Sequence, residues 1–297
     1  MTGFLERLSE SRVLIADGAM GTMLFQMGLE PGQCPEAINL THPEFLEEIA
    51  ASYLRAGAEL IQTNTFGGSP LKLAQYGLEG QAKKITENAV RAVRRVVGDR
   101  AYVSGSCGPC GRILKPYGDV DQDEVYAGFR SQMESLVGAS VDVICVETMT
   151  DLAEAGLAIK AAKDVSPAIP VMTTMTFDAT PRGFFTIMGV SVEQAAVGLA
   201  EAGADVIGSN CGNGIENMIK IARELRRRSE LPLIIQSNAG LPRTKEGITV
   251  YDETPEFMAE KARELIDLGV AIIGGCCGTP PEHIAALRRM ADSHTSR

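Results

Sequence analysis

Short apolar runs alternate with longer amphipathic segments from one end of the chain to the other. Each run contains Val or Ile, the pattern of a strand that is buried on both faces of a sheet. The expected strands are the runs at residues 13–16, 59–62, 102–104, 141–146, 171–175, 206–208, 233–236 and 271–273. The expected helices between them are at residues 43–56, 70–97, 122–138, 151–164, 191–202, 215–229, 255–268 and 281–293.

This alternation predicts parallel pairing, because the chain must cross back over the sheet before each new strand begins. Eight such units match the number that closes a sheet into a barrel surrounded by helices. No linker, low-complexity stretch or block of like charge divides the chain. We therefore predict the α/β class and a single (β/α)8 TIM-barrel domain over residues 1–297.

Three expected helices start with a capping pattern. Thr41, Ser191 and Thr279 each precede a helical segment and are followed three residues later by Glu or Gln. In a capping box the hydroxyl oxygen accepts a backbone N–H, and the Glu or Gln side chain reaches back to the cap residue. The helices are therefore expected to begin just after these residues.

A barrel of this kind carries its active site at the C-terminal ends of its strands, where the βα loops meet. In this chain those positions hold polar residues, cysteines and glycines. They are Asp17-Gly18-Ala19, residues 63–67, residues 105–111, Glu147, residues 176–178, Asn210-Cys211, residues 237–240 and Gly275-Cys276-Cys277. We expect the chemistry of the protein at this rim.

The adjacent thiols of Cys276 and Cys277 are the strongest candidates for that chemistry. Consecutive side chains of a regular strand point to opposite faces, so two neighbouring cysteines reach one ion only where the backbone bends. Gly274 and Gly275 precede the pair and Gly278 follows it, and glycine permits the dihedral angles of such a bend. The flanking glycines therefore favour a shared ligand site.

Cys211 is the best candidate for a third ligand, because it also ends an apolar run and precedes a helical segment. Catalytic zinc commonly has three protein ligands and one open position, whereas structural zinc has four protein ligands. Cys211 lies far from Cys276 in the chain, unlike the close pairs of ordinary zinc motifs. From the residues alone, a three-cysteine metal site and a set of buried or reactive thiols remain alternatives.

Composition narrows the cellular setting and the class of partner. Hydrophobic residues make up 45% of the chain and charged residues 22%, as in globular proteins with a large core. No apolar run approaches the roughly 18 residues of a membrane span, and the N-terminus lacks the pattern of a secretory signal. Seven cysteines then favour reduced thiols in the cytoplasm, and a net charge of −10 disfavours nucleic acids and anionic membranes.

In their order along the chain, the strand-end motifs resemble the homocysteine S-methyltransferase family, particularly the homocysteine-binding barrel of cobalamin-dependent methionine synthase. The resemblance covers nearly the whole chain. It is carried by residues 17–22 (DGAMGT), 63–67 (TNTFG), 108–111 (GPCG), 147–151 (ETMTD), 175–178 (MTFD), 210–211 (NC), 238–240 (NAG) and 275–279 (GCCGT). It implies an enzyme that transfers a methyl group to the thiol of homocysteine and so forms methionine.

The resemblance implies that Cys211, Cys276 and Cys277 hold Zn²⁺, with the sulfur of homocysteine as an exchangeable fourth ligand. A thiol attacks as its thiolate, and a metal-bound thiol is deprotonated at neutral pH. Three cysteinate ligands also leave the zinc site negatively charged, so that the substrate sulfur keeps enough electron density to attack a methyl group.

Homocysteine also carries an ammonium group and a carboxylate, and the resemblance implies residues that bind or orient this amino-acid end. Acidic side chains, backbone N–H groups beside glycine and amide side chains are expected around it. They are Glu147 and Asp17 for the amino-acid end, with Glu147 favoured as the partner of the ammonium group, Gly18 and Ala19 for the carboxylate, and Asn64 and Asn238 for orientation.

The sequence leaves the methyl donor open. Relatives that use betaine surround its quaternary ammonium with aromatic residues, and Gly67 and Thr148 stand where that branch has tyrosines, so betaine is disfavoured. The corrinoid-binding pattern Asp-x-His-x-x-Gly is missing from the sequence. Methylcobalamin would then arrive on a separate corrinoid protein, or a small sulfonium such as S-methylmethionine would serve instead.

Three other interpretations remain open. The barrel could bind zinc and homocysteine without catalysis and dock a corrinoid or methyltransferase partner. A metal-dependent aldolase or lyase fits less well, because such enzymes use carboxylate and histidine ligands for harder metals. Cys107 and Cys110 form a CxxC motif that by itself would indicate redox chemistry, although Gly111 and Pro116 follow where a helix would be expected.

Overall fold

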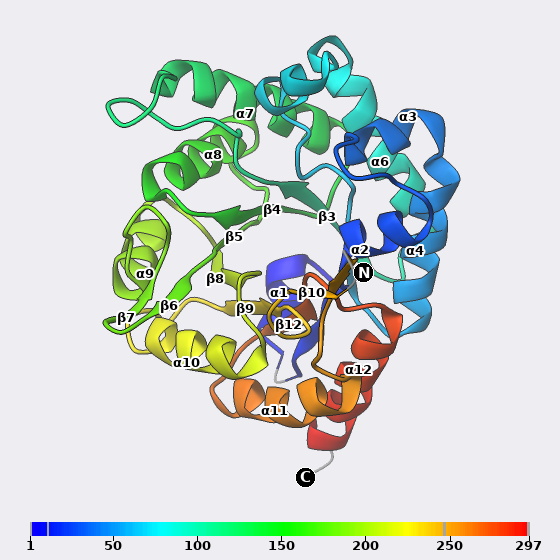
Figure 1. Ribbon diagram of the computed structural model, residues 1–297, viewed down its shortest axis with the longest axis vertical. Helices are drawn as coiled ribbons and strands as arrows, with labels where there is room; N and C mark the ends of the chain where they lie inside the picture. The colour runs from blue at the N-terminus through cyan, green and yellow to red at the C-terminus, as the bar shows by residue number, and fades with distance from the viewer. Residues whose placement is uncertain (1, 11, 246–247, 296–297) are drawn as a thin grey trace.

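Eight parallel strands form a ring at the centre of the computed structural model, which describes residues 2–10, 12–245 and 248–295 (Figure 1). The strands of the ring are β1 (Leu14–Ile15), β2 (Leu60–Gln62), β3 (Tyr102–Cys107), β4 (Val143–Met149), β5 (Val171–Met175), β8 (Val206–Asn210), β9 (Leu233–Ser237) and β12 (Ile272–Gly275). They pair in the order β1-β12-β9-β8-β5-β4-β3-β2. The N–H of Glu59 donates to the carbonyl of Ile15 at 2.7 Å and so joins β2 to β1. The predicted (β/α)8 barrel is therefore confirmed, and its treatment as one domain over residues 1–297 stays a prediction.

Helices surround the barrel and connect each strand to the next (Figure 1). They are α4 (Pro43–Arg55), α6 (Ala82–Val97), α7 (Gln122–Gly138), α8 (Leu152–Val165), α9 (Val192–Glu201), α10 (Ile215–Arg226), α11 (Pro255–Asp267) and α12 (Pro281–Thr295). The helix expected over residues 70–97 is instead divided into α5 (Pro70–Leu73), two short 3₁₀ turns, η2 (Ala74–Tyr76) and η3 (Glu79–Gln81), and α6. Gly77 causes the break, because its φ of +67° lies in the left-handed region that ends a helix.

The predicted caps have mixed outcomes. Ser191 forms the expected capping box at the start of α9, where its hydroxyl accepts from the N–H of Gln194 at 3.2 Å. The prediction for Thr41 is wrong, because this residue ends the short helix α3 (Ile38–Thr41) and its hydroxyl donates back to Ala37. The hydroxyl of Thr279 donates to the carbonyl of Cys276 at 2.5 Å, and so points back along the chain and not toward the helix it was expected to cap.

Inside the barrel, side chains at every second position of each strand point inward and form tiers. The lowest tier is apolar and packs against Phe4 of the short helix α1 (Phe4–Leu8). Its members are Leu14, Leu60, Tyr102, Val143, Met172, Val206, Ile234 and Ile272. The tier above it contains small or polar residues, namely Ala16, Gln62, Ser104, Cys145, Thr174, Gly208, Gln236 and Gly274. The barrel is therefore closed by apolar packing at its N-terminal end only.

The same alternation, continued to and past the C-terminal ends of the strands, defines an upper tier. Its positions are Gly18, Asn64, Ser106, Glu147, Thr176, Asn210, Asn238 and Cys276. This tier contains amide, hydroxyl, carboxyl and thiol groups and no large apolar side chain. The inward-facing positions of each strand therefore contribute core packing at its N-terminal end and candidate functional groups at its C-terminal end.

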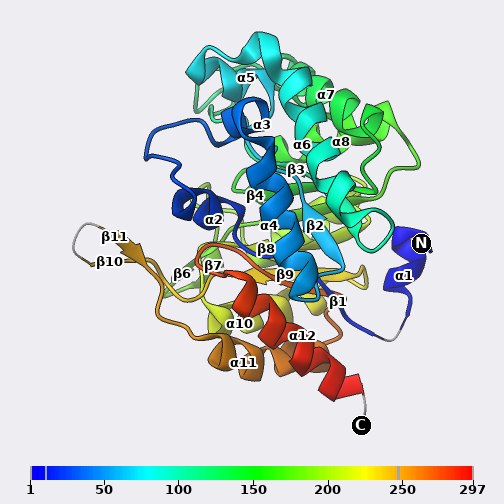
Figure 2. The ribbon, with the colours of Figure 1, turned by 90° about the vertical axis from the view of Figure 1, so that its right-hand side faces the viewer.

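Helix α1 covers the N-terminal end of the barrel, opposite the hairpin of β10 (Arg243–Lys245) and β11 (Ile248–Val250) (Figure 2). Phe4 packs edge-on against the ring of Tyr102, with centroids 5.4 Å apart. The Tyr102 hydroxyl donates to the carbonyl of Thr2 at 2.8 Å. These contacts fix α1 over the apolar tier.

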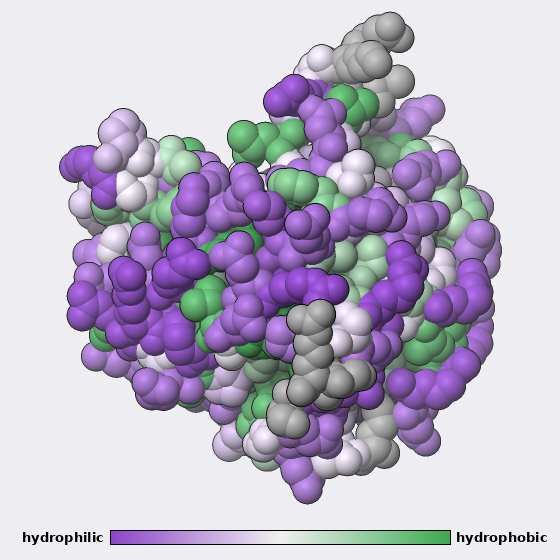
Figure 3. Space-filling view, turned by 90° about the horizontal axis from the view of Figure 1, so that it is seen from below, coloured by the Kyte–Doolittle hydropathy of each residue, from purple (hydrophilic) through white to green (hydrophobic). Residues whose placement is uncertain are grey.

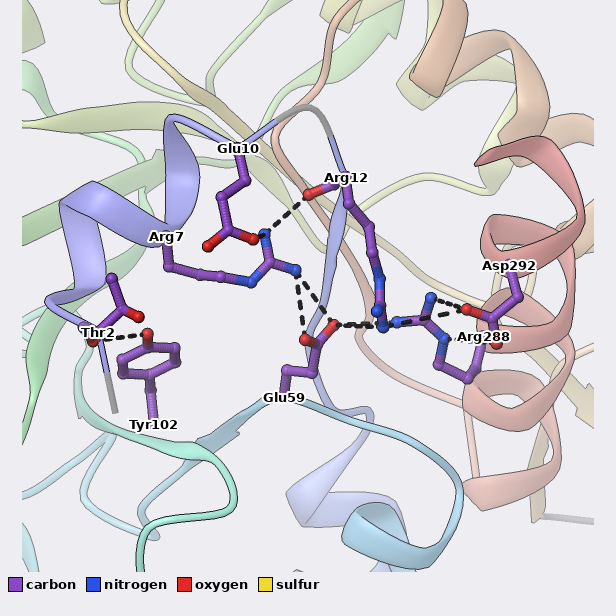
Figure 4. Close-up of polar contacts among 8 residues, drawn as sticks. All are labelled: Thr2, Arg7, Glu10, Arg12, Glu59, Tyr102, Arg288 and Asp292. Atoms are coloured by element: carbon purple, nitrogen blue, oxygen red, sulfur yellow. Dashed lines mark hydrogen bonds and ion pairs between the residues drawn. The ribbon is translucent and has the colours of Figure 1, made fainter. Parts of the chain in front are cut away.

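A cluster of ion pairs surrounds Glu59 at the same end of the barrel (Figure 4). Its carboxylate lies 3.2 Å from a guanidinium nitrogen of Arg7, 2.9 Å from one of Arg288 and 3.6 Å from one of Arg12. Arg7 comes from α1 and Arg288 from α12, and both side chains are largely buried. One carboxylate therefore links elements from both ends of the sequence to the start of β2.

The outer surface is mainly hydrophilic on the side of α11 and α12, where apolar side chains are scattered (Figure 3). This agrees with helices that bury one face against the barrel. Across residues 2–10, 12–245 and 248–295, no helix combines the length and the hydrophobicity needed to cross a membrane.

Replacing Glu59 with Gln is expected to lower the free energy of unfolding by about 1–3 kcal/mol, because the buried Arg7 then lies beside two other guanidinium groups with only the exposed Glu10, 3.4 Å away, as a counter-charge. Thermal unfolding should show a midpoint lower by a few degrees. Glu134→Gln is the matched control, since Glu134 and its partner Arg130 are both more than half exposed and such pairs contribute little. Equal losses in the two variants would contradict this account.

Candidate functional site

The three cysteines predicted as ligands come together at the C-terminal end of the barrel. Their sulfur atoms all lie within 4.8 Å of one another, and the sulfur of Cys211 is 3.8 Å from that of Cys277. Thiolate ligands about 2.3 Å from a tetrahedral zinc ion are themselves about 3.8 Å apart. The arrangement of Cys211, Cys276 and Cys277 therefore suits a tetrahedral metal ion.

Backbone hydrogen bonds between neighbouring strands hold this arrangement. The N–H of Cys211 donates to Gln236 at 3.1 Å, and the N–H of Cys276 donates to Ser237 at 2.8 Å. The carbonyl of Cys277 accepts from Ala239 at 3.0 Å. The loops that follow β8, β9 and β12, which are adjacent in the barrel, are thus tied to one another at the cysteines.

Cys211 has a φ of +60°, in the left-handed region. This conformation costs a non-glycine residue roughly 1–2 kcal/mol. It is kept because the surrounding hydrogen bonds determine it, and such backbone strain is concentrated at functional sites. The bend after β8 directs a third sulfur toward the Cys276-Cys277 pair.

The glycines around the cysteine pair act in two ways. Gly278 has a φ of +77°, as expected for the bend. The expectation is wrong for Gly274 and Gly275, which are not in the left-handed region. A Cβ on Gly275 would lie 2.1 Å from Oγ1 of Thr279, and one on Gly274 would lie 2.8 Å from Cβ of Ala16. These two glycines are therefore needed for space.

The three thiols share hydrogen bonds that change their acidity. Hydrogen bonds from Cys211 and then Cys276, together with one from Tyr251, lower the pKa of Cys277 to about 3. Hydrogen bonds with Cys211 and Cys277 raise the pKa of Cys276 well above its usual value. These hydrogen bonds favour the thiolate form of Cys277, and a soft cation is the partner that a set of sulfur donors favours.

Two buried carboxyl groups lie on the same rim. Asp17 is 1% exposed and Glu147 is 7% exposed. Burial raises the pKa of Asp17 to about 8, with a smaller contribution from the charge of Glu147, and burial raises the pKa of Glu147 to about 7. Oδ2 of Asp17 accepts from the N–H of Gln62 at 2.8 Å, but Oδ1 has no hydrogen-bond partner among the described residues. A cation such as an ammonium group would stabilise either of these buried carboxyl groups in its charged form.

Ser106 and Asn210 hold Glu147 in place, although the sequence alone did not indicate a role for either residue. The Ser106 hydroxyl donates to Oε1 of Glu147, and Nδ2 of Asn210 lies 3.5 Å from Oε2. Both residues occupy upper-tier positions of their strands. Counting in steps of two from the first apolar residue of each strand would have identified them.

The remaining predicted residues have defined but different settings. The N–H of Ala19 already donates to the carbonyl of Thr279 at 3.2 Å, and a Cβ on Gly18 would lie 2.2 Å from the same oxygen. Asn64 donates to Pro35 and to Asn39, both at 2.8 Å, and so holds the segment before α3. Their predicted contacts with a substrate stay predictions.

Asn238 differs from Asn64, because its side-chain oxygen is buried and accepts no hydrogen bond from any described residue. Its backbone N–H donates to Asn213 at 3.0 Å, which joins the loops after β8 and β9. An unpaired buried oxygen is costly in a protein interior. The oxygen is therefore available to a ligand or a metal ion.

The CxxC motif does not have the setting of a reactive pair. Cys107 ends β3 and its thiol donates to Oε1 of Gln132 at 3.3 Å, whereas the thiol of Cys110 donates to the carbonyl of Arg112 at 3.4 Å. Burial raises the pKa of Cys107 well above its usual value and that of Cys110 to about 12. Reactive cysteines have lowered pKa values instead, so the geometry favours packing roles for both.

Two hairpins that the pattern of apolar runs did not predict lie beyond the rim. One consists of β6 (Asp178–Thr180) and β7 (Gly183–Phe185), and the other of β10 and β11. Figure 2 shows the second projecting from this end of the barrel. Tyr251, which follows β11, packs so closely on Gly278 that a Cβ there would lie 2.3 Å from its ring. The second hairpin is thus anchored beside the cysteines.

Comparison with known proteins agrees with this geometry. The family model described as homocysteine S-methyltransferase matches residues 14–291. The methionine synthase of Mycobacterium leprae is 31% identical over 319 aligned residues, which cover 100% of this chain and 26% of that protein. The methionine synthase of Mycobacterium tuberculosis is 32% identical over 302 residues, which cover 95% and 25%. The chain thus spans about a quarter of the length of these relatives.

Solved structures share the fold. The homocysteine methyltransferase MmuM from Escherichia coli, in its metallated form, superposes with a TM-score of 0.79 at 24% identity and covers 95% of this chain and 97% of its own. Its apo form superposes with a TM-score of 0.74 at 23% identity and covers 97% and 98%. At this level of identity the likeness shows a common fold.

The buried carboxyl of Glu147 predicts an unusual dependence of stability on pH. In the metal-free protein it keeps its proton up to about pH 7, whereas the usual value is 4.5. The folded state then binds more protons than the unfolded state between these values, so the stabilisation present below pH 4.5 is lost as the pH rises to 7. Glu147→Gln should remove about 3 kcal/mol of this decline, as measured by urea unfolding across the range. Parallel curves for the two proteins would contradict the prediction.

Proposed function

We propose that this chain, which belongs to the homocysteine S-methyltransferase family, transfers a methyl group to the thiol of homocysteine and so forms methionine. The observation that carries the proposal is the presence of a three-sulfur cluster and a buried carboxyl pair on one rim. The cluster suits the sulfur end of an amino acid, and the carboxyl pair suits its ammonium group. Homocysteine carries both groups.

We assign zinc to Cys211, Cys276 and Cys277. When bound, zinc lowers the pKa of a coordinated thiol, so that the thiol is deprotonated at neutral pH. The sulfur spacing of 3.8 Å and the preference of thiolates for soft metal ions support this assignment. The E. coli homocysteine methyltransferase was also solved in a metallated form.

The amino-acid end of homocysteine is assigned to the buried carboxyl groups. Glu147 binds the ammonium group, and Asp17 lies in the same polar region and reinforces the negative potential. The carboxylate is assigned to the backbone near Gly18 and Ala19, and Asn64 and Asn238 orient the rim. Burial supports the first assignment, because a charged hydrogen bond is strong where water is excluded.

The transfer requires no proton acceptor at the moment of reaction. The sulfur of homocysteine supplies the electron pair of the new S–CH₃ bond, and the bond between the methyl carbon and its donor breaks. The electron pair of that bond leaves with the donor, and the thiol proton is released to solvent. The side chains of the rim act by binding and orienting the thiol in line with the methyl group.

Two classes of methyl donor fit the proposal. One is methylcobalamin carried on a separate corrinoid protein, which the likeness to methionine synthases supports. The other is a small sulfonium such as S-methylmethionine. We place the reaction in the cytoplasm, because all seven cysteines are free thiols and reducing compartments keep them so.

Replacing Cys276 with Ser is expected to weaken zinc binding by more than about 100-fold. Loss of a residue that only supports a metal ligand already costs up to about 100-fold, and Cys276 is proposed as a ligand itself. Elemental analysis of the purified protein should find one zinc per chain before the change and little after it. Cys34→Ser is the control, because Cys34 is buried outside the rim and bonds to Glu36. Full zinc content in the Cys276 variant would overturn the assignment.

Replacing Glu147 with Gln is expected to raise the KM for homocysteine by about 10–100-fold, the effect of losing one charged hydrogen bond. Methionine formation should be followed with S-methylmethionine and, separately, with methylcobalamin. Glu154→Gln is the control, because Glu154 is equally buried but accepts its hydrogen bond from Cys110. Binding of zinc and homocysteine without methionine from either donor would favour a docking role over catalysis.

A further inference from the structure

The side chain of Asn210 lies between the two halves of the rim. It is 1% exposed and ends β8, one residue before Cys211. Its Nδ2 atom lies 3.5 Å from Oε2 of Glu147 and 3.9 Å from the sulfur of Cys276. One amide nitrogen therefore contacts a group at the carboxyl end and a group at the sulfur end of the site.

Other hydrogen bonds fix the orientation of this amide. Its Oδ1 atom accepts from the backbone N–H of Thr148 at 2.9 Å and from the hydroxyl of Thr174 at 2.7 Å. Its Nδ2 atom donates to the hydroxyl of Thr148 at 2.7 Å. A backbone N–H can only donate, so the oxygen must face Thr148 and the NH₂ group must face Glu147 and Cys276. The amide is thus locked with its donors toward the site.

The same amide stabilises a distortion in β4. The pairing register between β4 and β5 shifts between Val146 and Met149, as in a β-bulge, and Thr148 has a φ of +58°. Bulges redirect a side chain out of the regular alternation and often lie beside active sites. Asn210 bonds to both the N–H and the hydroxyl of Thr148, and so holds the bulge that carries Glu147.

From these contacts we propose that Asn210 is a positioning residue that sets the separation between the carboxyl of Glu147 and the sulfur cluster at Cys276. The inference rests on the proposed function and adds a determinant of acceptor length to it. Homocysteine has one methylene group more than cysteine between its ammonium-bearing carbon and its sulfur. A fixed separation selects the longer thiol, because cysteine cannot place both ends at once.

The test compares three thiols on the zinc-loaded full chain by calorimetry. They are homocysteine, cysteine and 4-mercaptobutanoate, which keeps the thiol and the carboxylate but lacks the ammonium group. Asn210→Ala is expected to weaken homocysteine binding by at least about tenfold, as for loss of a hydrogen bond to a charged group. It should leave 4-mercaptobutanoate within about twofold and reduce the preference for homocysteine over cysteine. Bound zinc should stay at the wild-type level.

Ser209→Ala is the matched control, because Ser209 is the preceding residue of β8, is fully buried and has a hydroxyl without a described partner. It should bind all three thiols as the unchanged chain does. Thr148→Val removes the hydroxyl oxygen that accepts from Nδ2 of Asn210 at 2.7 Å. It should weaken homocysteine binding and reduce the preference for homocysteine over cysteine, both by less than Asn210→Ala does. This second variant keeps the test decisive should Asn210→Ala fold poorly.

Two other outcomes have distinct meanings. An unchanged preference for homocysteine over cysteine in both variants, or an equal loss for all three thiols, would overturn the positioning role and leave the proposed function intact. Failure of the unchanged chain to bind homocysteine at all would overturn the proposed function and this inference with it.

Discussion

Hydrogen bonding between β1 and β2 closes the barrel, and the position of every functional side chain depends on this closure. Once the N–H of Glu59 reaches the carbonyl of Ile15, the ring fixes which residues face inward on each strand. Apolar packing then occupies the N-terminal tier, and Phe4 of α1 covers it. The opposite tier is left for groups that a core would not tolerate, including Glu147, Asn210 and Cys276.

Much of this arrangement could be predicted from the sequence, because it depends on local patterns. Short apolar runs located the strands, and the cysteines at 211, 276 and 277 were placed on one rim by the parallel order. What local patterns did not reveal depends on contacts between distant segments. Asn210 orients Glu147 through Thr148 on another strand, and Gly275 is needed because Thr279 folds back over it. The helix break at Gly77 and the two hairpins were missed because periodicity alone does not define such interruptions.

The rim brings together groups that repel or destabilise one another without a ligand. A thiolate in the cysteine cluster, a carboxyl at Asp17 and another at Glu147 are all desolvated. Burial without a counter-charge is unfavourable, so the two carboxyl groups hold protons in the free protein that a cation would displace. Binding of an ammonium group and a soft metal ion therefore relieves an unfavourable burial that already exists in the free protein.

The ion pairs around Glu59 join α1 and α12 on the face opposite the rim (Figures 2 and 4). A barrel immobilised through either helix would present its cysteines to the solution.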